Sequence, residues 1–600
     1  MLMRPFAKGS GRLAYLMPTR RGARIGLLAL VVAYGALLRL DALTLTYGVV
    51  ERPSWLRSLQ SSRGPESVVR PSGFRWQRSE GRYISDPVTY LKYAREMRSF
   101  YAAHGREPLY PLATKISLRL LSDQDIAVSF TSMFFSVLAI VGTFLLGSYA
   151  FSYWVGLGAA AAMAIEYDVV TWGVGGWRDD AFTAVVVFCA LAMLRYARIG
   201  SAGAAVALGA IAGIACLVRI TSLSFLLPGL VWAVTIVRGP WTVRARHATL
   251  MVLTAGLIAA PYFVNCWRTY GNPFWAIDIH TAVYRETEGE TAAFSQTAAQ
   301  YVSSKFRSRP WQSVDTAVLG LTEYPFTNKW QGFNAWHSEL GKLLSWAALI
   351  GLLLFVGSRE GRLLLMVLAA SLVPYMITWK LIHDWRFTLH AYPFFLTAAA
   401  YAIATAARVG HPQWLRARLS EIKPSKVAGW TAAALIVGTG VWITQRILPV
   451  VVAKETLRHD EAVSVIAGAR DGAFLAGGWG PPETAGNVTA RVNELSGGTI
   501  SLPLPEMRDY RLTIRLDPFP GPSSSDPEGL PWVHVAMNGR LVRAFEMTWN
   551  HERVGAYTVV VPKHYLNAHG NVLHVSALTK RARRARVRWW YVRIQPWTRS

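Results

Sequence analysis

The sequence has few cysteines and few acidic residues for its length. Cys189, Cys216 and Cys266 are the only cysteines among 600 residues, and each lies inside an apolar run. We interpret them as small packing residues, so neither a disulfide framework nor a cysteine metal site is predicted. Aspartate and glutamate number 36 against 63 lysines and arginines, which gives a formal net charge of +27. This imbalance favours anionic lipids or phosphorylated substrates as partners.

The sequence also lacks a recognised nucleic-acid-binding motif and a convincing signal-peptide cleavage site. Without such a motif, the basic charge does not predict nucleic-acid binding. The first apolar run is long enough to span a bilayer, so we interpret it as a retained anchor. Long uncharged runs recur along the chain, 52% of the residues are hydrophobic and the mean hydropathy is +0.24. These values exclude an ordinary soluble protein and predict a polytopic α-helical membrane protein.

About eleven membrane-spanning helices are expected. The N-terminal residues 1–24 carry basic residues and no acidic one, which predicts that this end lies in the cytoplasm. The basic residues of the later short loops fall on the same side. Outer loops are then expected at 48–125 and 269–340, and the C-terminus lies outside. The predicted spans are 25–47, 126–149, 152–173, 179–197, 203–218, 222–237, 248–268, 341–357, 361–379, 387–407 and 428–448.

Residues 449–600 have a different pattern from the membrane domain expected over 25–448. Period-two alternation, which is typical of strands, recurs in several short runs, and Asn538-Gly539 predicts a hairpin turn between two of them. We predict an extracytoplasmic, jelly-roll-like β-sandwich of ordinary domain size. Two interpretations are open for a group of basic and aromatic residues in this domain. They could bind sugars or lipid headgroups, or they could form a solvated edge and ordinary core aromatics, and we favour the second interpretation. The group is Arg581, Arg583, Arg584, Trp589, Trp590 and Trp597.

The segment 84–101 in the first outer loop predicts an amphipathic helix. Asp86 can cap it and Pro87 suits its first helical position. A second short helix is expected near 109–121. An aromatic face and a basic face suit the surface of a membrane. The helical spacing gives one face with Tyr90, Tyr93, Ala94, Met97, Phe100 and Tyr101, and another with Lys92, Arg95 and Arg98.

Ionisable residues gather at the outer ends of the predicted spans. Such residues are costly at membrane depth and are usually functional. For any single residue, helix capping or interfacial snorkelling is the alternative explanation. Because the whole set lies on one side, we predict a site at the outer boundary of the membrane. The set is Asp41, Glu166, Asp168, Arg178, Asp179, Asp180, Arg219, Lys380, His383, Asp384 and Arg386.

Several of these stretches resemble the GT-C glycosyltransferases. Residues 86–97 are similar to the first outer-loop motif of the protein O-mannosyltransferases and of the aminoarabinose transferases of lipid A. Residues 106–111, 178–182 and 385–393 resemble three further family segments in the same order. The resemblance covers most of residues 25–448. Pro87 replaces a family glutamate, and Thr89 replaces a basic residue, which makes Lys92 a candidate for the phosphate contact.

The resemblance implies transfer of a sugar from a polyprenyl-phosphate-linked donor to a glycan, lipid or protein acceptor. Asp86 would be the general base of a single, inverting displacement at the outer face of a plasma membrane, with a bacterial membrane preferred to a eukaryotic one. Asp41, Asp179 and Asp180 would orient the acceptor or tune Asp86. No cofactor is obligatory; a divalent metal would suit the acidic cluster, but no ligand spacing requires one. The implied substrate-binding residues are Tyr90, Lys92, Arg178, Arg219, Lys380, His383 and Arg386.

Two other classes of function stay open. A transporter or flippase of lipid-linked sugars would use similar groups, but it should show charges on both faces and internal repeats, neither of which is clear in the sequence. A non-catalytic membrane scaffold for the β-sandwich would leave the membrane motifs dispensable. Among enzymes, an oligosaccharide ligase or a polymerising arabinosyl- or mannosyltransferase is not separated from a monosaccharide transferase.

Overall fold

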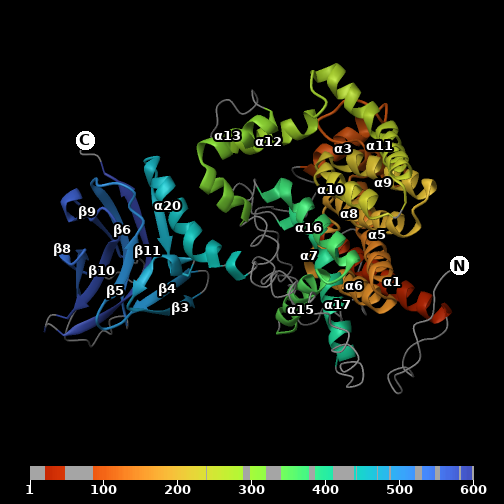
Figure 1. The fold of residues 1–600 in the computed structure, drawn as a ribbon. Coiled ribbons are helices and arrows are strands. Elements are labelled where there is room, and N and C mark those ends of the chain that lie inside the picture. Colours follow the sequence, from red (N-terminus) through yellow and green to blue (C-terminus); the bar gives the residue numbers. More distant parts are fainter. Residues whose placement is uncertain are drawn as a thin grey trace. The chain divides into compact units, whose positions relative to one another are not determined.

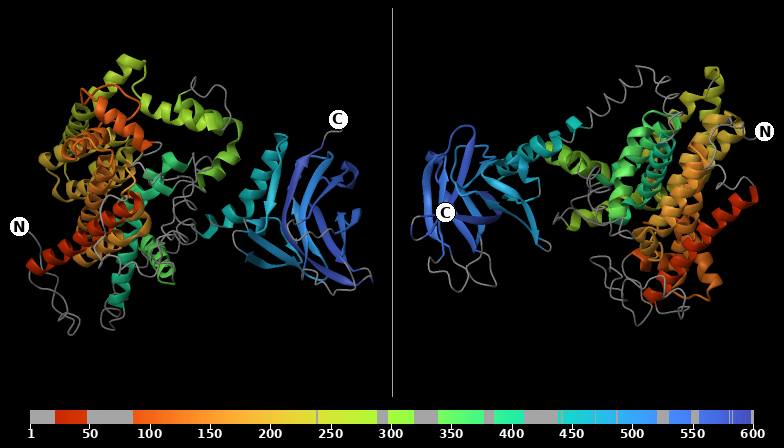
Figure 2. Two further views of the ribbon diagram at one scale, coloured as in Figure 1. Left: turned by 180° about the vertical axis from the view of Figure 1, so that it is seen from behind. Right: turned by 90° about the horizontal axis from the view of Figure 1, so that it is seen from below.

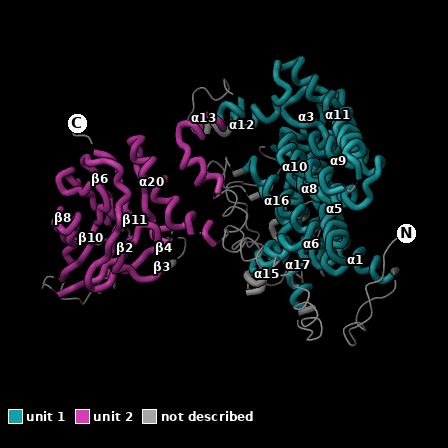
Figure 3. The backbone as a smooth tube through the Cα atoms, viewed as in Figure 1, with its two compact units in different colours: residues 1–301, 319–431 teal, residues 302–318, 432–600 magenta. Residues whose placement is uncertain are grey.

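The chain forms two compact units in the computed structural model (Figure 3). The first unit comprises residues 1–301 and 319–431, and the second comprises 302–318 and 432–600. The structure describes residues 21–47, 86–237, 239–287, 297–318, 339–376, 385–409, 438–440, 442–468, 470–485, 488–519, 530–547, 555–579, 581 and 583–597.

The first unit is helical (Figure 1). Its core lies among the long helices, with α8 packed against α5 on one side and α9 on the other. The helices are α1 (Arg21–Tyr47), α3 (Asp86–Glu96), α4 (Leu109–Leu120), α5 (Ala127–Ala150), α6 (Tyr153–Ile165), α7 (Tyr167–Trp172), α8 (Asp179–Ile199), α9 (Ala202–Val218), η3 (Ile220–Ser222), α10 (Leu223–Ile236), α11 (Trp241–Tyr270), α12 (Trp275–Thr287), α15 (Glu339–Phe355), α16 (Arg359–Met376), η5 (Trp385–Ala391) and α17 (Tyr392–Val409), while α13 (Ala298–Ser308) continues into the second unit.

Four helices in the described part are long and apolar enough to cross a membrane: 22–43 of α1, α5, α8 and α11. Shorter apolar helices occupy 153–165, 202–218, 220–236 and 344–355. Most of the expected spans are thus helical, but the total of eleven stays a prediction. The span expected at 152–173 is interrupted, because the backbone at Glu166 is extended between α6 and α7. The span expected at 428–448 lies largely outside the described residues.

Close packing of α9 against α11 depends on two glycines one helical turn apart. A Cβ atom at Gly209 would lie 2.5 Å from the carbonyl oxygen of Met251, and one at Gly213 would lie 2.9 Å from that of Ala255. Small residues at this spacing let helix backbones approach closely in membranes. The contact fixes the end of α9, from which Arg219 follows.

Helices α3 and α4 confirm the two short helices expected before the second span. Tyr90 and Met97 of the aromatic face are buried, whereas Lys92 and Arg98 of the basic face are exposed. The composition of the aromatic face suggested contact with a membrane surface, and the structure shows a different contact. It packs on protein, with the Tyr90 and Tyr110 rings 4.9 Å apart, because α4 supplies an apolar face that covers it.

The second unit is an antiparallel β domain (Figures 1 and 2). In the described residues its eleven strands form two groups, β3-β4-β11-β6-β9 with β1 on β11, and β2-β5-β10-β7-β8, joined by the β10–β11 pair. Both groups contribute to one core. The strands are β1 (Val463–Ile466), β2 (Leu475–Gly477), β3 (Trp479–Ala485), β4 (Val488–Asn493), β5 (Gly498–Leu502), β6 (Tyr510–Phe519), β7 (Trp532–Met537), β8 (Arg540–Glu546), β9 (Gly555–Val561), β10 (Asn571–Leu578) and β11 (Arg584–Pro596), preceded by α20 (Leu448–Arg458).

The predicted strand runs and hairpin turn are confirmed. Asn538 and Gly539 both have positive φ, at 50° and 80°, as a tight two-residue hairpin between β7 and β8 requires. Trp589 is fully buried in the core, as the favoured interpretation expected, and Arg583 and Arg584 are exposed.

The segment 302–318 belongs to this second unit. Arg309 forms an ion pair with Glu461 at 2.6 Å, and Asp315 forms one with Arg470 at 2.9 Å. The second unit therefore includes a piece of the predicted 269–340 outer loop as well as the C-terminal domain.

Candidate active site

The first ion pair of the site joins the start of α3 to the connection between α3 and α4. Arg106 donates from Nη2 to Oδ1 of Asp86 at 2.6 Å, and the two side chains are 15% and 19% exposed. The Arg106 guanidinium also lies 5.8 Å from the ring centroid of Tyr90. Burial raises the pKa of Tyr90 to about 12, so its hydroxyl stays protonated at neutral pH.

A second, fully buried ion pair joins Glu107 to Arg178, which precedes α8. The other carboxylate oxygen of Glu107 accepts a hydrogen bond from the Ile220 N–H at 2.8 Å. Burial alone would raise the pKa of Glu107, but Arg178 and the Ile220 N–H hold it below its ordinary value. Glu107 thus links three separate segments of the chain.

The third ion pair lies where α9 ends. Arg219 has an extended backbone between α9 and η3, and its Nη1 donates to Asp179 Oδ1 at 2.7 Å. Both side chains are buried. The guanidinium lies 5.3 Å from the ring centroid of Phe182 and 5.6 Å from that of Tyr375. The aromatic rings and the carboxylate together fix its orientation.

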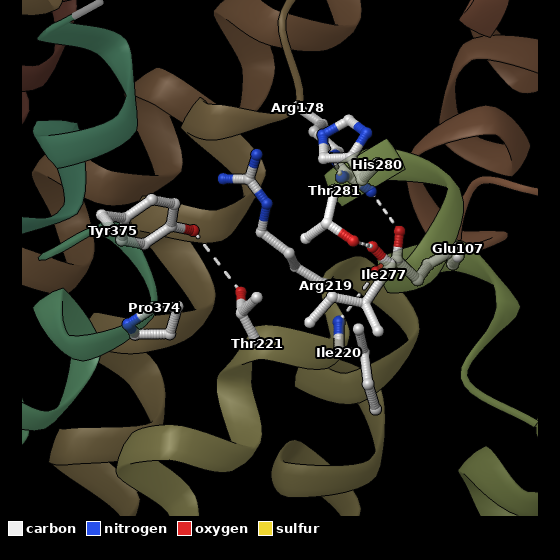
Figure 4. A pocket seen from close by; sticks show the side chains of 11 residues that line it. Glu107, Arg178, Arg219, Ile220, Thr221, Ile277, His280, Thr281, Pro374 and Tyr375 are labelled. Carbon is white, nitrogen blue, oxygen red and sulfur yellow. Dashed lines mark hydrogen bonds and ion pairs between the residues drawn. The ribbon is translucent and has the colours of Figure 1, made fainter. Parts of the chain in front are cut away.

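His280 of α12 connects the first two pairs. Its Nε2 lies 3.2 Å from Arg106 Nη1 and 3.5 Å from Arg178 Nη2. Figure 4 shows His280 beside Arg178, with Arg219 between this pair and Tyr375. The first two ion pairs and His280 therefore form one polar network, and the Arg219–Asp179 pair lies next to it, because Asp179 follows Arg178 in the chain.

A pocket with about 550 Å³ of empty volume opens in this network (Figure 4). Arg178 and Arg219 supply its positive charge, and the Thr221 and Tyr375 hydroxyl oxygens lie 3.4 Å apart on one wall. The lining residues are Glu107, Arg178, Arg219, Ile220, Thr221, Ala276, Ile277, His280, Thr281, Pro374 and Tyr375.

A second, apolar pocket shares Ile220 with the first. It has about 970 Å³ of empty volume and lies among α9, α10, α11 and the start of α12. Its lining is almost entirely hydrocarbon and aromatic: Cys216, Ile220, Leu223, Ala255, Gly256, Ala259, Ala260, Phe263, Val264, Trp267, Pro273 and Phe274. A charged pocket and an apolar pocket thus meet at one side chain.

The structure brings together five of the residues singled out in the sequence: Asp86, Tyr90, Arg178, Asp179 and Arg219. Others lie elsewhere. Lys92 is exposed and pairs with Glu96 at 4.0 Å. Asp180 is buried and accepts a hydrogen bond from Ser132 at 2.7 Å. Asp41 is buried on α1.

The side chains of the remaining predicted substrate-binding residues lie outside the described part of the chain. Lys380 and His383 are not described, and Arg386 is described only as part of the η5 backbone. Among the residues that the structure describes, no group of three or more His, Cys, Asp and Glu residues lies close enough to hold a metal ion.

The sequence did not single out Glu107, Arg106, His280 or Tyr375. Arg106 and Glu107 lie in the segment 106–111, which resembles a family segment. That resemblance is the sequence feature that could have identified them as site residues. His280 lies in a long polar loop and Tyr375 in an apolar run, where histidine and tyrosine are unremarkable. Only the packing of α12 and α16 around Arg219 identifies these two residues.

Comparison with known proteins identifies the segment that builds most of this site. Residues 104–264 match the family model of dolichyl-phosphate-mannose-protein mannosyltransferases. Over these residues the match agrees with the resemblance to protein O-mannosyltransferases seen in the sequence. The matched segment contains Glu107, Arg178, Asp179 and Arg219, whereas Asp86 and His280 lie outside it. None of the curated proteins matches the chain.

Three solved structures are similar to the chain at low identity. The oligosaccharyltransferase AglB from Archaeoglobus fulgidus, in complex with an inhibitory peptide and a dolichol-phosphate, has 15% identity and a TM-score of 0.37, covering 70% of this chain and 55% of its own. ArnT from Cupriavidus metallidurans, bound to undecaprenyl phosphate, has 15% identity and a TM-score of 0.38, covering 70% and 65%. The A. fulgidus enzyme with Zn and sulfate has 14% identity and a TM-score of 0.34, covering 70% and 52%. The chain thus spans less than two thirds of each.

Proposed function

We propose that the protein is a membrane glycosyltransferase that moves a sugar from a polyprenyl-phosphate-linked donor to a cell-envelope glycan, lipid or protein at the outer face of the membrane. The observation that carries this proposal is the meeting of the two pockets at Ile220. A lipid-linked sugar phosphate has an anionic centre next to a long hydrocarbon chain. A cationic pocket that adjoins an apolar one is complementary to that combination.

The donor would lie across both pockets. Its phosphate would contact Arg178 and Arg219, whose guanidinium groups are oriented by Glu107 and Asp179 and can hold phosphate oxygens through paired N–H donors. Its isoprenoid chain would follow the apolar pocket between α9 and α11. The arginines would also stabilise the phosphate as it leaves, so the leaving group needs no acid.

Asp86 is the proposed general base. The acceptor oxygen attacks the anomeric carbon, the bond from that carbon to the phosphate oxygen breaks, and the acceptor proton passes to Asp86. Such assistance contributes roughly 10²–10⁴-fold to the rate. A single displacement inverts the anomeric centre. The partial exposure of Asp86 and its link through Arg106 and His280 to Arg178 support this role.

The proposed topology is a plasma-membrane protein with about eleven spans and an extracytoplasmic C-terminal domain. Residues 302–318 pack within the second unit, and they belong to a loop that the charge pattern places outside. The C-terminal domain would then lie on the same side as that loop.

Deletion and complementation in the host test this proposal. Loss of the gene should remove one sugar from an envelope glycan, with accumulation of the corresponding polyprenyl-phosphate sugar, both measured by mass spectrometry. The wild-type gene should restore the glycan, and Asp86→Asn should not, at equal protein level. Asp123→Asn, which changes an exposed carboxylate that pairs with Arg95, is the matched control and should restore it. Full restoration by Asp86→Asn would remove Asp86 as the base.

A further inference from the structure

The outer surface of the β domain carries a row of arginines on β6. Leu512, Ile514 and Leu516 are fully buried in the core. Because side chains alternate across a strand, the residues between them point outward. The outward positions of β6 therefore include Arg511 and Arg515.

Strand β11 lies beside β6 and adds three more arginines to the same surface. Val587 and Ile594 of β11 point into the core, so Arg586, Arg588 and Arg593 point outward. In the ladder, Arg593 lies opposite Thr513, and Arg588 lies opposite Asp517. We call the outward side chains Arg511, Arg515, Arg586, Arg588 and Arg593 the arginine face.

A β-bulge places two aromatic contacts on this face. The register shifts between Trp589 and Tyr591, and Trp590 donates from Nε1 to Asp517 at 2.6 Å. The Arg515 guanidinium lies 5.9 Å from the ring centroid of Trp590, and that of Arg511 lies 3.6 Å from the ring centroid of Trp597. The rings hold these guanidinium planes in fixed orientations.

The positive charge of the face is only partly balanced. Asp517 is the one carboxylate at the described outward positions of β6 and β11, and it accepts from Arg588 at 3.2 Å. The outward residues of the adjacent strand β9, Ala556, Thr558 and Val560, are uncharged. The five arginines repel one another, and the single carboxylate of Asp517 offsets only part of this repulsion. Binding of an anionic ligand would relieve the rest.

We propose that the arginine face binds an extended anionic polysaccharide that bears a carboxylate or phosphate group on its repeating units. Guanidinium groups grip both kinds of anion through two parallel N–H donors. Arg511 and Arg515 lie four residues apart on β6, about 13 Å along the strand, and Arg593 lies opposite Thr513 between them, so these three charges follow the strand in a line that suits a linear polymer. A membrane-binding surface would instead present aliphatic side chains for insertion, and the outward positions described on these two strands carry none. The aromatic rings of this face, Trp597, Trp590 and Phe519, lie against Arg511, Arg515 and Arg588. This binding site is independent of the proposed transferase site.

The experiment uses the full-length protein in nanodiscs of neutral phosphatidylcholine, with polygalacturonate as the anionic probe and dextran as the neutral one. Binding of polygalacturonate should weaken at least about tenfold in R511Q/R593Q, which is about 1.4 kcal/mol. The control R540Q/K454Q removes two exposed charges outside the face, on β8 and α20, and should stay within about twofold of wild type. Dextran should not bind.

A second variant separates the contribution of charge from that of guanidinium geometry. R511K/R593K keeps both charges but removes the paired guanidinium donors, and it should bind polygalacturonate more tightly than R511Q/R593Q and more weakly than wild type. Equal weakening in R511Q/R593Q and in the control would show a non-specific charge effect and overturn the proposal. So would binding to phosphatidylglycerol vesicles that depends on the arginine face when polygalacturonate does not bind.

Discussion

At the scale of single residues, the site is built from carboxylates and guanidinium groups that are buried together. Removing water from a charge is costly, so each buried cation requires a partner close by. Arg178 has Glu107 and Arg219 has Asp179, and all four side chains are at most 5% exposed. The pairs therefore support the fold as well as holding the arginines in place for a phosphate.

Glu107→Gln tests the structural part of this role. The substitution leaves the Arg178 charge buried beside a neutral amide, and loss of one partner of a buried pair costs roughly 3–5 kcal/mol. We expect a clearly lower midpoint of thermal unfolding for the purified protein in detergent. Glu96→Gln is the control, because the Lys92–Glu96 pair is exposed and such pairs contribute about 0–1 kcal/mol. Equal midpoints for the two variants would contradict the buried pair.

The same pair gives the stability a defined dependence on pH. The pKa of Glu107 is lowered in the folded protein, so its contribution is complete above the unfolded value of about 4.3 and is lost as the pH falls further. The wild-type midpoint should therefore fall more steeply below about pH 4.3 than that of Glu107→Gln. Parallel curves would show that Glu107 does not contribute in this way.

The sequence identified the site residues whose charge is unusual for their apolar surroundings. Arg178, Asp179 and Arg219 adjoin apolar spans, where charge is costly and therefore conspicuous. Glu107 and His280 lie in polar connections, where charged and polar residues are common, so only their contacts identify them. Asp180 shows the reverse: it looked like its neighbour Asp179, yet one position along α8 turns its side chain toward Ser132 instead of Arg219.

At the scale of elements, periodicity was sufficient for most helices and strands. Strands β6 and β11 alternate because one side meets the core, and α3 has one apolar face because only that face is covered. Periodicity cannot say what covers a face, which is why the aromatic side of α3 was assigned to a membrane surface and not to α4. It also did not show the break at Glu166, because the apolar run before Glu166 and the one after Asp168 together have the length of one span.

The α9–α11 contact provides a prediction at this scale. Gly209→Leu would insert a side chain where the Met251 carbonyl oxygen would lie 2.5 Å from the new Cβ, so the two helices must separate. Overpacking of this kind costs typically 1–3 kcal/mol and would displace Arg219 at the end of α9. We expect a lower unfolding midpoint and loss of complementation. Gly203→Leu, on the same helix with no atom within 4 Å of the new Cβ, is the matched control and should behave as wild type. Equal unfolding midpoints and equal complementation for Gly209→Leu and Gly203→Leu would show that the two helices do not pack as described.

At the scale of the whole molecule, the two units share the chain in an interleaved way. The chain leaves the first unit, contributes 302–318 to the second, returns, and then enters the second unit again at 432. The Arg309–Glu461 and Asp315–Arg470 ion pairs require both parts of the second unit to be on one side of the membrane. An even number of spans must therefore separate them, in agreement with the four expected over 341–448.

Cysteine labelling in intact cells tests this parity. The native cysteines Cys189, Cys216 and Cys266 are buried, so they should give little background with a membrane-impermeant maleimide. Ser308→Cys and Ala568→Cys, both at exposed positions of the second unit, should be labelled in intact cells. Thr242→Cys, exposed in the first turn of α11 next to arginines that predict a cytoplasmic location, should be labelled only after permeabilisation. Labelling of only one of the two cysteines in the second unit would contradict its contacts, and labelling of Thr242→Cys in intact cells would contradict the orientation.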